Sequence, residues 1–214
     1  MPSSSKKVFF GDYVFHVTEN VYEPAEDSFL FAENLPVGTG DRVVDMGTGC
    51  GILGVIAATK ADEVVAVDIN PYAVRCAKEN AELNHVAEKM SFVQGDLFSS
   101  IRAGERFDLV LFNAPYLPSD DEDEDSWLAR SWTGGVSGRN VIDRFISGAP
   151  KHLEPNGEIL LVQSTLSDVE ETLSRFAGSR LRAEVVASQI LPLFEQIVLI
   201  RAKSLQIKND VGLG

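Results

Sequence analysis

Cysteine and long apolar runs are both scarce in this sequence. Cys50 and Cys76 are the only cysteines among its 214 residues. Cys50 stands in a glycine-rich loop and Cys76 in an expected helix, so we interpret both as reduced thiols of a cytoplasmic protein. No apolar run approaches the roughly 18–20 residues that span a bilayer. The polar N-terminal residues also lack the apolar core of a secretory signal. These absences argue against a membrane protein and against a disulfide-stabilised one.

Positive charge is scarce as well, with 19 Lys and Arg residues against 32 Asp and Glu and a formal net charge of −13. Such a surface repels a polyphosphate backbone, so free DNA or RNA is an unfavourable partner. The unbroken acidic run Asp120–Asp125 is expected to be a solvated loop or a docking surface for a basic substrate. His16, His85 and His152 lack metal-ligand spacing, so no metal is predicted in this chain.

Short apolar segments alternate with helical patterns through most of the chain. A hairpin is expected over 8–17, and helices over 24–34, 52–59, 71–83, 141–149 and 166–177. Strands are expected over 42–45, 63–67, 91–94, 107–112, 158–162, 182–188 and 196–201. This alternation predicts a doubly wound, mostly parallel α/β sheet, in one domain over residues 1–214 with a core at about 20–203. The last two strands should pair antiparallel, because no helix separates them. That ending resembles the seven-stranded, Rossmann-like fold of class I S-adenosylmethionine-dependent methyltransferases, here with a small N-terminal hairpin and helix extension.

A glycine-rich motif, Asp45-Met-Gly-Thr-Gly-Cys-Gly51, follows the first strand of this expected sheet. In open parallel sheets, ligands bind beyond the carboxyl ends of the strands. Gly47 and Gly49 permit positive φ angles and let a ligand approach the backbone. Asp45 stands where a carboxylate could pair with a ligand ammonium. The overlapping stretch Gly49–Gly54 also matches the G-x-G-x-x-G pattern of dinucleotide-binding proteins, so NAD is a weaker alternative cofactor.

Acidic residues follow two further strands of the expected sheet. Asp68 ends the second strand, where a carboxylate can accept hydrogen bonds from both ribose hydroxyls. Asp96 follows the third strand, where it can accept a hydrogen bond from an adenine amino group while Leu97 packs on the ring. Acids after three consecutive strands exceed what tight turns need. The sequence therefore predicts a nucleoside-bearing cofactor rather than glycines that serve only a turn.

A second motif, Asn113-Ala-Pro-Tyr116, closes the fourth strand, which is expected beside the first. An amide nitrogen is a poor nucleophile, because its lone pair is delocalised. The Asn113 side-chain oxygen and the Ala114 carbonyl could accept its two N–H bonds and aim it at a methyl group. Catalysis would then be mostly orientation and electrostatics. Pro115 would fix the backbone and Tyr116 could stack on the planar group. Alone, this tetrapeptide could be an Asn-x-Pro turn. With the glycine-rich motif, it predicts methyl transfer from S-adenosylmethionine to a planar, amide-like nitrogen.

The sequence resembles the HemK-type methyltransferases, in particular the archaeal and eukaryotic branch that modifies peptide-chain release factors. The resemblance covers about residues 13–199 and rests on motifs that stand in the family's order. These motifs are Tyr22–Leu30 (Tyr-Glu-Pro-Ala-Glu-Asp-Ser-Phe-Leu), Asp45–Gly51, Asp68–Pro71, Asp96–Leu97, Asn113–Tyr116 and Trp132–Phe145.

This resemblance implies N5-methylation of the glutamine in the Gly-Gly-Gln loop of a release factor. It also implies a small zinc-binding activator subunit in a heterodimer, which we expect on the sheet edge around Phe92. By match to the family, the residues that contact the cofactor or line its pocket would be Ser28, Asp45, Gly47, Asp68, Asp96, Leu97 and Asn113. Asn113 would also hold the substrate amide. Ala114 departs from the family's usual proline, which preserves the backbone carbonyl but puts the stiffness of the loop in doubt.

Other functions stay open at this point. An adenine-N6 DNA methyltransferase could use a similar motif, but the net charge of −13 disfavours it. A protein-lysine methyltransferase would need the pocket to admit a different side-chain nitrogen. A cofactor-binding scaffold without catalysis is the non-enzyme alternative, for which Ala114 is the only hint. Trp127 and Trp132 lie in the segment 117–138, which has little hydrophobic periodicity, and could seat this loop on the core or contact the substrate.

Overall fold

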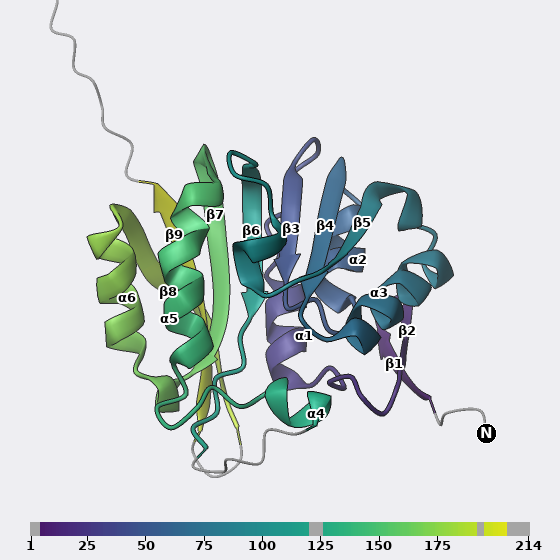
Figure 1. The fold of residues 1–214 in the computed structure, drawn as a ribbon, viewed down its shortest axis with the longest axis horizontal. Coiled ribbons are helices and arrows are strands. Elements are labelled where there is room, and N and C mark those ends of the chain that lie inside the picture. Colours follow the sequence, from purple (N-terminus) through teal and green to yellow (C-terminus); the bar gives the residue numbers. More distant parts are fainter. Residues whose placement is uncertain (1–4, 120–125, 192–194, 205–214) are drawn as a thin grey trace, which may run out of the picture.

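The computed structural model describes residues 5–119, 126–191 and 195–204 of the chain (Figure 1). Its centre is a seven-stranded sheet with the strand order β5-β4-β3-β6-β7-β9-β8. The strands are β3 (Arg42–Met46), β4 (Glu63–Asp68), β5 (Met90–Gln94), β6 (Phe107–Asn113), β7 (Leu153–Ser164), β8 (Leu181–Ile190) and β9 (Gln196–Ser204). Pairing is parallel from β5 to β7, and β9 runs antiparallel to both β7 and β8. The predicted seven-stranded, mostly parallel sheet with an antiparallel ending is confirmed.

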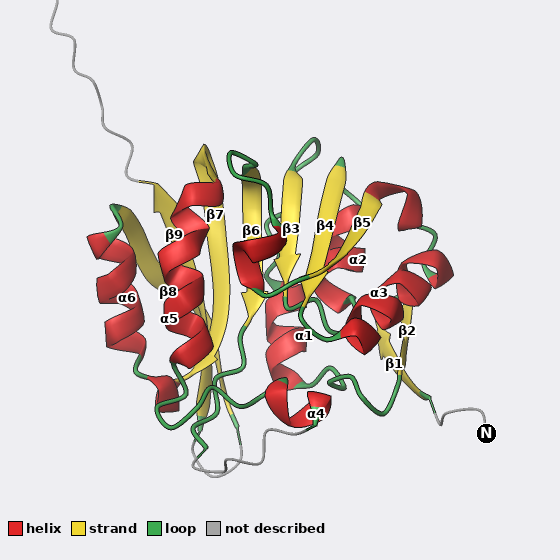
Figure 2. Cartoon of the chain, in the orientation of Figure 1, coloured by secondary structure: helices red, strands yellow, loops and turns green. Residues whose placement is uncertain are grey.

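Helices cover both faces of the sheet (Figure 2). They are α1 (Glu26–Glu33), α2 (Ile52–Ala58), α3 (Pro71–Leu83), α5 (Asn140–Gly148) and α6 (Val169–Gly178), with short 3-10 helices η1 (Ala87–Lys89), η2 (Leu97–Ser100), η3 (Ala149–His152) and η4 (Thr165–Ser167). Successive strand residues point to opposite faces. Val43 and Leu109 pack with α1, α2 and α3, whereas Val44 and Val110 pack with α5 and α6. The core is thus two apolar layers with the sheet between them.

The N-terminal hairpin pairs β1 (Lys6–Phe10) with β2 (Tyr13–Val17) and turns at Gly11, which has a φ of 54°. Two asparagines hold it against the domain, one in α3 and one directly after it. Asn80 accepts a hydrogen bond from the His16 backbone N–H at 2.8 Å, and Asn84 accepts one from Val14 at 3.1 Å. The hairpin is therefore an extension that packs on the helical layer rather than a part of the central sheet.

Several element boundaries differ from the sequence predictions. Helix α6 begins at Val169 rather than at residue 166, because Asp168 adopts a left-handed φ of 54° and caps the helix by accepting from the Glu171 N–H. Helix α1 begins at Glu26 rather than at residue 24. Strand β7 begins at Leu153 rather than at 158, with an irregular register opposite Phe107. The segment 117–138 contains the short helix α4 (Trp127–Arg130), whereas the acidic run 120–125 and the tail from 205 lie outside the described residues.

Cys50 and Cys76 are buried free thiols. Burial raises the pKa of Cys76 to about 11, which keeps the thiol protonated near neutral pH. Across residues 5–119, 126–191 and 195–204, no helix combines the length and apolar character needed to cross a bilayer. In the same ranges, no group of three or more His, Cys, Asp or Glu residues could hold a metal ion.

Candidate active site

One cavity of about 510 Å³ opens at the carboxyl ends of strands β3, β4, β5 and β6. This volume lies within the range of small-molecule and cofactor pockets. Most of the residues predicted from the sequence line it, namely Ser28, Gly47, Gly49, Asp68, Asp96, Leu97, Asn113, Ala114, Pro115 and Tyr116. The two predicted motifs therefore face a single space, although they belong to separate segments of the chain.

The glycine-rich loop connects β3 to α2 along the floor of this cavity. Gly47, Gly49 and Gly51 all have positive φ angles, of 66°, 57° and 87°. At Gly51 a side chain is also excluded by packing, because an added Cβ would lie 3.0 Å from the Cα of Ala77 in α3. The glycines thus serve the turn and the approach of α3, and they leave backbone rather than side chains facing the cavity.

Asp68 lines the cavity at the end of β4 and is tied to the glycine loop. Its carboxylate accepts hydrogen bonds from the backbone N–H groups of Gly49 and Asn70, both at 2.9 Å. Burial raises the pKa of Asp68 above its ordinary value, and these backbone bonds oppose that shift. The carboxylate is held rigidly by the main chain, which suits an acceptor for ligand hydroxyl groups.

Asp45 lies behind the cavity wall rather than among the residues that line it. Its Oδ2 accepts from the Thr48 hydroxyl at 2.6 Å and from the Gly54 N–H at 2.9 Å. Its residue exposure is 1%. Burial raises the pKa of Asp45 to about 7, although the bonds from Thr48 and Gly54 act in the opposite direction. In this structure the carboxylate braces the glycine loop, and its pairing with a ligand ammonium stays a prediction.

Asp96 and Leu97 follow β5 on the far side of the cavity. Arg144 of α5 donates to the Asp96 carboxylate at 2.5 Å, and this arginine also lines the cavity. Arg144 was not among the residues predicted from the sequence, because the recognisable pattern in its helix is the apolar stripe. Its guanidinium places a positive charge beside an otherwise acidic set of strand ends.

Asn113 ends β6 and makes contacts that the sequence did not predict. Its Nδ2 donates to Asp27 Oδ2 at 3.0 Å and to Ser28 Oγ at 3.2 Å. Its Oδ1 is buried and has no hydrogen-bond partner. Asp27 is 5% exposed and lies in the first turn of α1. The only sequence signal for it was an acid directly before Ser28 in a motif of the family resemblance.

Two tyrosines also point at the Asp27 carboxylate. The Tyr22 hydroxyl lies 3.1 Å from Asp27 Oδ1, and the Tyr116 hydroxyl lies 3.4 Å from Asp27 Oδ2. Burial, and then the charge of Asp27, raise the pKa of each tyrosine above its ordinary value. Both phenols therefore remain protonated donors. We call Tyr22, Asp27, Ser28, Asn113 and Tyr116 the Asp27 cluster.

The backbone of the Asn113–Tyr116 motif is anchored from a different direction. Ala114 is 4% exposed, and its N–H donates to the Val162 carbonyl of β7 at 3.4 Å. Ser167 donates its hydroxyl to the Tyr116 carbonyl. Beyond the motif, the Gly134 N–H donates to the Leu117 carbonyl at 2.9 Å, which returns the chain past the cavity. Neighbouring strands and loops thus hold the segment, even with alanine at position 114.

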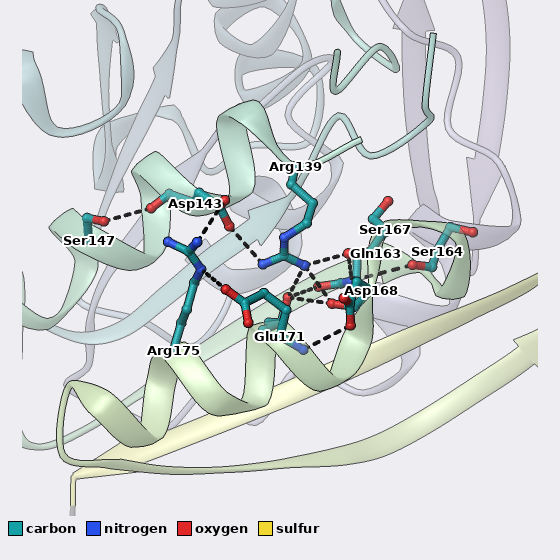
Figure 3. Close-up of polar contacts among 10 residues, drawn as sticks. Arg139, Asp143, Ser147, Gln163, Ser164, Ser167, Asp168, Glu171 and Arg175 are labelled. Carbon is teal, nitrogen blue, oxygen red and sulfur yellow. Dashed lines mark hydrogen bonds and ion pairs between the residues drawn. The ribbon is translucent and has the colours of Figure 1, made fainter. Parts of the chain in front are cut away.

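A buried arginine supports that anchor (Figure 3). Arg139 donates to the carbonyls of Ser167 and Asp168, to the Thr172 hydroxyl, and to the Asp143 carboxylate at 2.7 Å. Gln163 accepts from Thr172 at 2.6 Å. We call the residues joined in this way the Arg139 cluster, namely Arg139, Asp143, Gln163, Ser167, Asp168 and Thr172.

The segment around α4 forms another wall of the cavity. Trp127 and Trp132 both line it, and the Arg130 guanidinium lies 5.3 Å from the centre of the Trp127 ring. Trp132 is 39% exposed. The expectation that these tryptophans seat the loop or meet a substrate is consistent with their position on the same cavity as Asn113.

Comparisons with known proteins show the family to which this chain belongs. The profile of the methyltransferase small domain family matches residues 20–129. A protein of Methanocaldococcus jannaschii, named as a putative protein N5-glutamine methyltransferase, is 42% identical over 184 residues, covering 85% of this chain and 91% of the relative. The human methyltransferase HEMK2 is 33% identical over 165 residues, covering 72% of this chain and 76% of the relative.

Solved structures give the same picture. Mtq2 of E. cuniculi, in complex with Trm112 and responsible for methylation of the translation termination factor eRF1, is 26% identical with a TM-score of 0.66, over 87% of this chain and 99% of that chain. The M. jannaschii tRNA m1G37 methyltransferase, at 21% identity and a TM-score of 0.69, over 95% of this chain and 58% of that chain, shares the fold alone. The chain therefore belongs to the methyltransferase small domain family and, within it, to the HemK2/Mtq2-type protein N5-glutamine methyltransferases.

Proposed function

We propose that the cavity binds S-adenosylmethionine and holds the glutamine side chain of a release-factor Gly-Gly-Gln loop for methylation at N5. The observation that carries this proposal is that the predicted cofactor residues and the Asn113 motif line one cavity. Three of the predicted cofactor residues, Asp68, Asp96 and Leu97, line the same space as Asn113 and its motif. A methyl donor and a planar amide could therefore be held side by side.

The cofactor would occupy the side of the cavity formed by β3, β4 and β5. Asp68 is the acceptor for the ribose hydroxyls, since its carboxylate is already oriented by two backbone bonds at 2.9 Å. Asp96 and Leu97 would hold the adenine. Gly47 and Gly49 leave room for the ligand beside the backbone. This arrangement disfavours NAD, because the Asn113 motif has no role in hydride transfer.

The substrate amide would enter on the β6 side, against Asn113. A bound cofactor would supply an electrophilic methyl group, and the residues of this chain would hold the amide nitrogen beside it. The Asn113 Oδ1 and the Ala114 carbonyl would accept the two amide N–H bonds and orient the nitrogen. Tyr116 and the tryptophans Trp127 and Trp132 would flank the planar group. Catalysis therefore depends on position and hydrogen bonding rather than on a strong base.

The protein substrate is supported by the relatives and by charge. The E. cuniculi relative methylates a translation termination factor, and the net charge of −13 disfavours duplex DNA as the acceptor. Arg130 and Arg144 are cations at an otherwise acidic cavity rim. A glutamine amide fits Asn113 better than a lysine ammonium does, because an amide offers two in-plane N–H donors.

A small zinc-binding activator subunit is proposed for the β5 edge. Among the strands that the structure describes, β5 pairs only with β4 and ends the sheet. Phe92 and Gln94 line a shallow hollow between β5 and α3. An added strand there would complete the open edge behind the adenine side, leaving Asn113 accessible. The E. cuniculi relative is itself found in complex with Trm112.

Labelled S-adenosylmethionine tests the reaction directly. The chain, with and without the activator subunit, is incubated with a Gly-Gly-Gln release factor, and the labelled residue is mapped by mass spectrometry. The matched control is the same factor with the glutamine changed to asparagine. We expect label on the glutamine only, at a higher rate with the activator. Label on lysine or on duplex DNA, with none on the glutamine, would contradict the proposal.

A further inference from the structure

We propose that Asp27 is a positioning residue that fixes the orientation of the Asn113 amide, so that Oδ1 is the atom presented to the substrate. This inference deepens the proposed function and rests on it. It concerns how the Asn113 side chain is oriented before any substrate binds, which no motif in the sequence specifies. The two residues are 86 positions apart in the chain.

The first argument is the chemistry of the contact. An ionised carboxylate can only accept hydrogen bonds, whereas an asparagine amide has a donor end and an acceptor end of nearly equal size. Asn113 Nδ2 lies 3.0 Å from Asp27 Oδ2. The opposite orientation would set Oδ1 against the carboxylate oxygen at the same distance, with two acceptors facing each other. The carboxylate therefore selects one of two otherwise similar orientations.

The second argument is the atom left over. With Nδ2 committed to Asp27 and Ser28, the Asn113 Oδ1 is buried and unpaired. Buried acceptors without partners are uncommon in folded proteins and call for an explanation. Asn113 lines the cavity, so a substrate N–H is the partner that this oxygen lacks. In the opposite orientation a donor would face the substrate N–H bonds, and no hydrogen bond from the substrate amide to Asn113 could form.

The third argument is that Asp27 is itself held in place. Its Oδ1 accepts from the Ser28 N–H at 2.6 Å and from the Tyr22 hydroxyl at 3.1 Å. Its Oδ2 is shared between Asn113 and the Tyr116 hydroxyl. The α1 turn and two tyrosines thus fix the carboxylate, and the carboxylate fixes the amide. The side chain of Tyr116 is oriented by the same group.

A charge exchange between the two positions tests this inference. In Asp27→Asn, the new side chain can offer either end to Asn113, so kcat should fall on the order of 10-fold while cofactor affinity changes little. In Asn113→Asp, two carboxylates face each other, and the rate at neutral pH should fall on the order of 100-fold or more.

The double variant D27N/N113D is the decisive arm. The amide introduced at position 27 can donate to the carboxylate introduced at position 113, which leaves a carboxylate oxygen facing the substrate. The rate should therefore recover roughly 10-fold above N113D alone. Glu26→Gln is the matched control, since it removes one negative charge from a neighbour in the same helical turn that is less buried than Asp27. Its rate should equal that of the unmodified protein. Cofactor affinity and thermal unfolding are measured for every variant to confirm that each one folds.

A second readout does not depend on turnover. In the unmodified protein, the side-chain N–H signals of Asn113 in nuclear magnetic resonance should be shifted downfield and exchange slowly, because one N–H is bonded to a carboxylate. These features should disappear in D27N and persist in E26Q. Wild-type activity in D27N, no recovery in the double variant, or unchanged Asn113 signals in D27N would each overturn the inference. Absence of glutamine methylation by the unmodified protein would instead contradict the proposed function.

Discussion

The Asp27 cluster and the Arg139 cluster both hold the Asn113–Tyr116 segment, yet they differ in what they leave open. In the Asp27 cluster, Asp27 contacts the side chains of Asn113 and Tyr116, and all five members line the cavity. The Arg139 cluster reaches only the Tyr116 carbonyl, through Ser167, and Arg139 does not line the cavity. In the first cluster the unpaired buried atom is Asn113 Oδ1, an acceptor of a residue that lines the cavity. In the second it is Arg139 Nε, a donor of a residue outside the cavity lining.

This difference separates a cluster that belongs to the functional site from a cluster that stabilises the fold. Both clusters contain buried polar residues and are densely hydrogen-bonded, so burial and bonding alone cannot assign function. An unpaired acceptor on a residue that lines a cavity points to a missing ligand group, whereas a charge enclosed by carbonyl groups points to a role in stability. We therefore expect substitutions in the Asp27 cluster to change rate, and substitutions in the Arg139 cluster to change the free energy of unfolding.

The largest expected effect is on the stability of the Arg139→Met variant. This change removes a buried cation together with its bonds to the Asp143 carboxylate and to the carbonyls of Ser167 and Asp168. The free energy of unfolding should fall by about 3–5 kcal/mol, as measured by urea denaturation. Arg175→Met is the control, because its side chain is 42% exposed and exposed ion pairs contribute at most about 1 kcal/mol. Equal losses in the two variants would remove the distinction between the clusters.

Asn113→Ala should show the opposite pattern. It deletes the acceptor for the substrate amide, so the methylation rate should fall on the order of 100-fold or more. The free energy of unfolding should fall by about 1–3 kcal/mol, less than in Arg139→Met, because Asp27 loses the Nδ2 donor but keeps its bonds from Ser28 and Tyr22. Single-turnover rates and thermal melts measure the two quantities separately. A variant with near-normal rate would show that Asn113 does not hold the substrate.

How far the sequence predicts these features depends on the range of the contacts involved. Helix α3 was predicted with its observed ends, because Asn70 caps it locally and Pro71 occupies its first position. The glycine loop and the strand-end acids were predicted for the same reason, since each is set by neighbours in the chain. The start of α6 was wrong, because the left-handed conformation of Asp168 has no pattern in the sequence.

The part of the site that the sequence did not predict depends on long-range contacts. Asp27 resembles any acid in a first helical turn, where the helix dipole already favours negative charge. Only the packing of α1 beside the end of β6 brings it to Asn113. Arg139 likewise stands in a glycine-rich loop, and its burial depends on carbonyls at 167 and 168. A local pattern therefore predicted most of the residues that line the cavity but not those that hold them.

Asp68 and Asp45 allow the same comparison, between a residue that lines the cavity and one that lies behind its wall, in the part of the cavity proposed to bind the cofactor. Asp68 lines the cavity, so Asp68→Ala should weaken binding of S-adenosylmethionine by about 1–3 kcal/mol, the cost of leaving buried hydroxyl groups unpaired. Calorimetry with the cofactor and with its demethylated product would measure this loss. Asp62→Ala is a suitable control, since Asp62 lies before β4 and away from the lining residues. Unchanged affinity in D68A would mean that the ribose is held elsewhere.

Asp45 should affect stability through pH and have the smallest effect of this series. Its folded pKa of about 7 lies above the value of about 3.9 expected in the unfolded chain. The folded state therefore holds the proton more tightly, and this contribution to stability is full below about pH 4 and is lost as the pH rises through about 7. Between pH 6 and pH 8 the cofactor-free protein should lose about 1–2 kcal/mol of unfolding free energy from this group. Asp45→Asn keeps an oxygen for the Gly54 N–H and should flatten the curve, as urea titrations at several pH values would measure. Asp68 would retain part of the slope, because burial shifts its pKa in the same direction. An identical dependence of the unfolding free energy on pH in the unmodified protein and in Asp45→Asn would mean that Asp45 stays ionised throughout. Asp45 would then behave like a carboxylate in the cavity and would be grouped with Asp68.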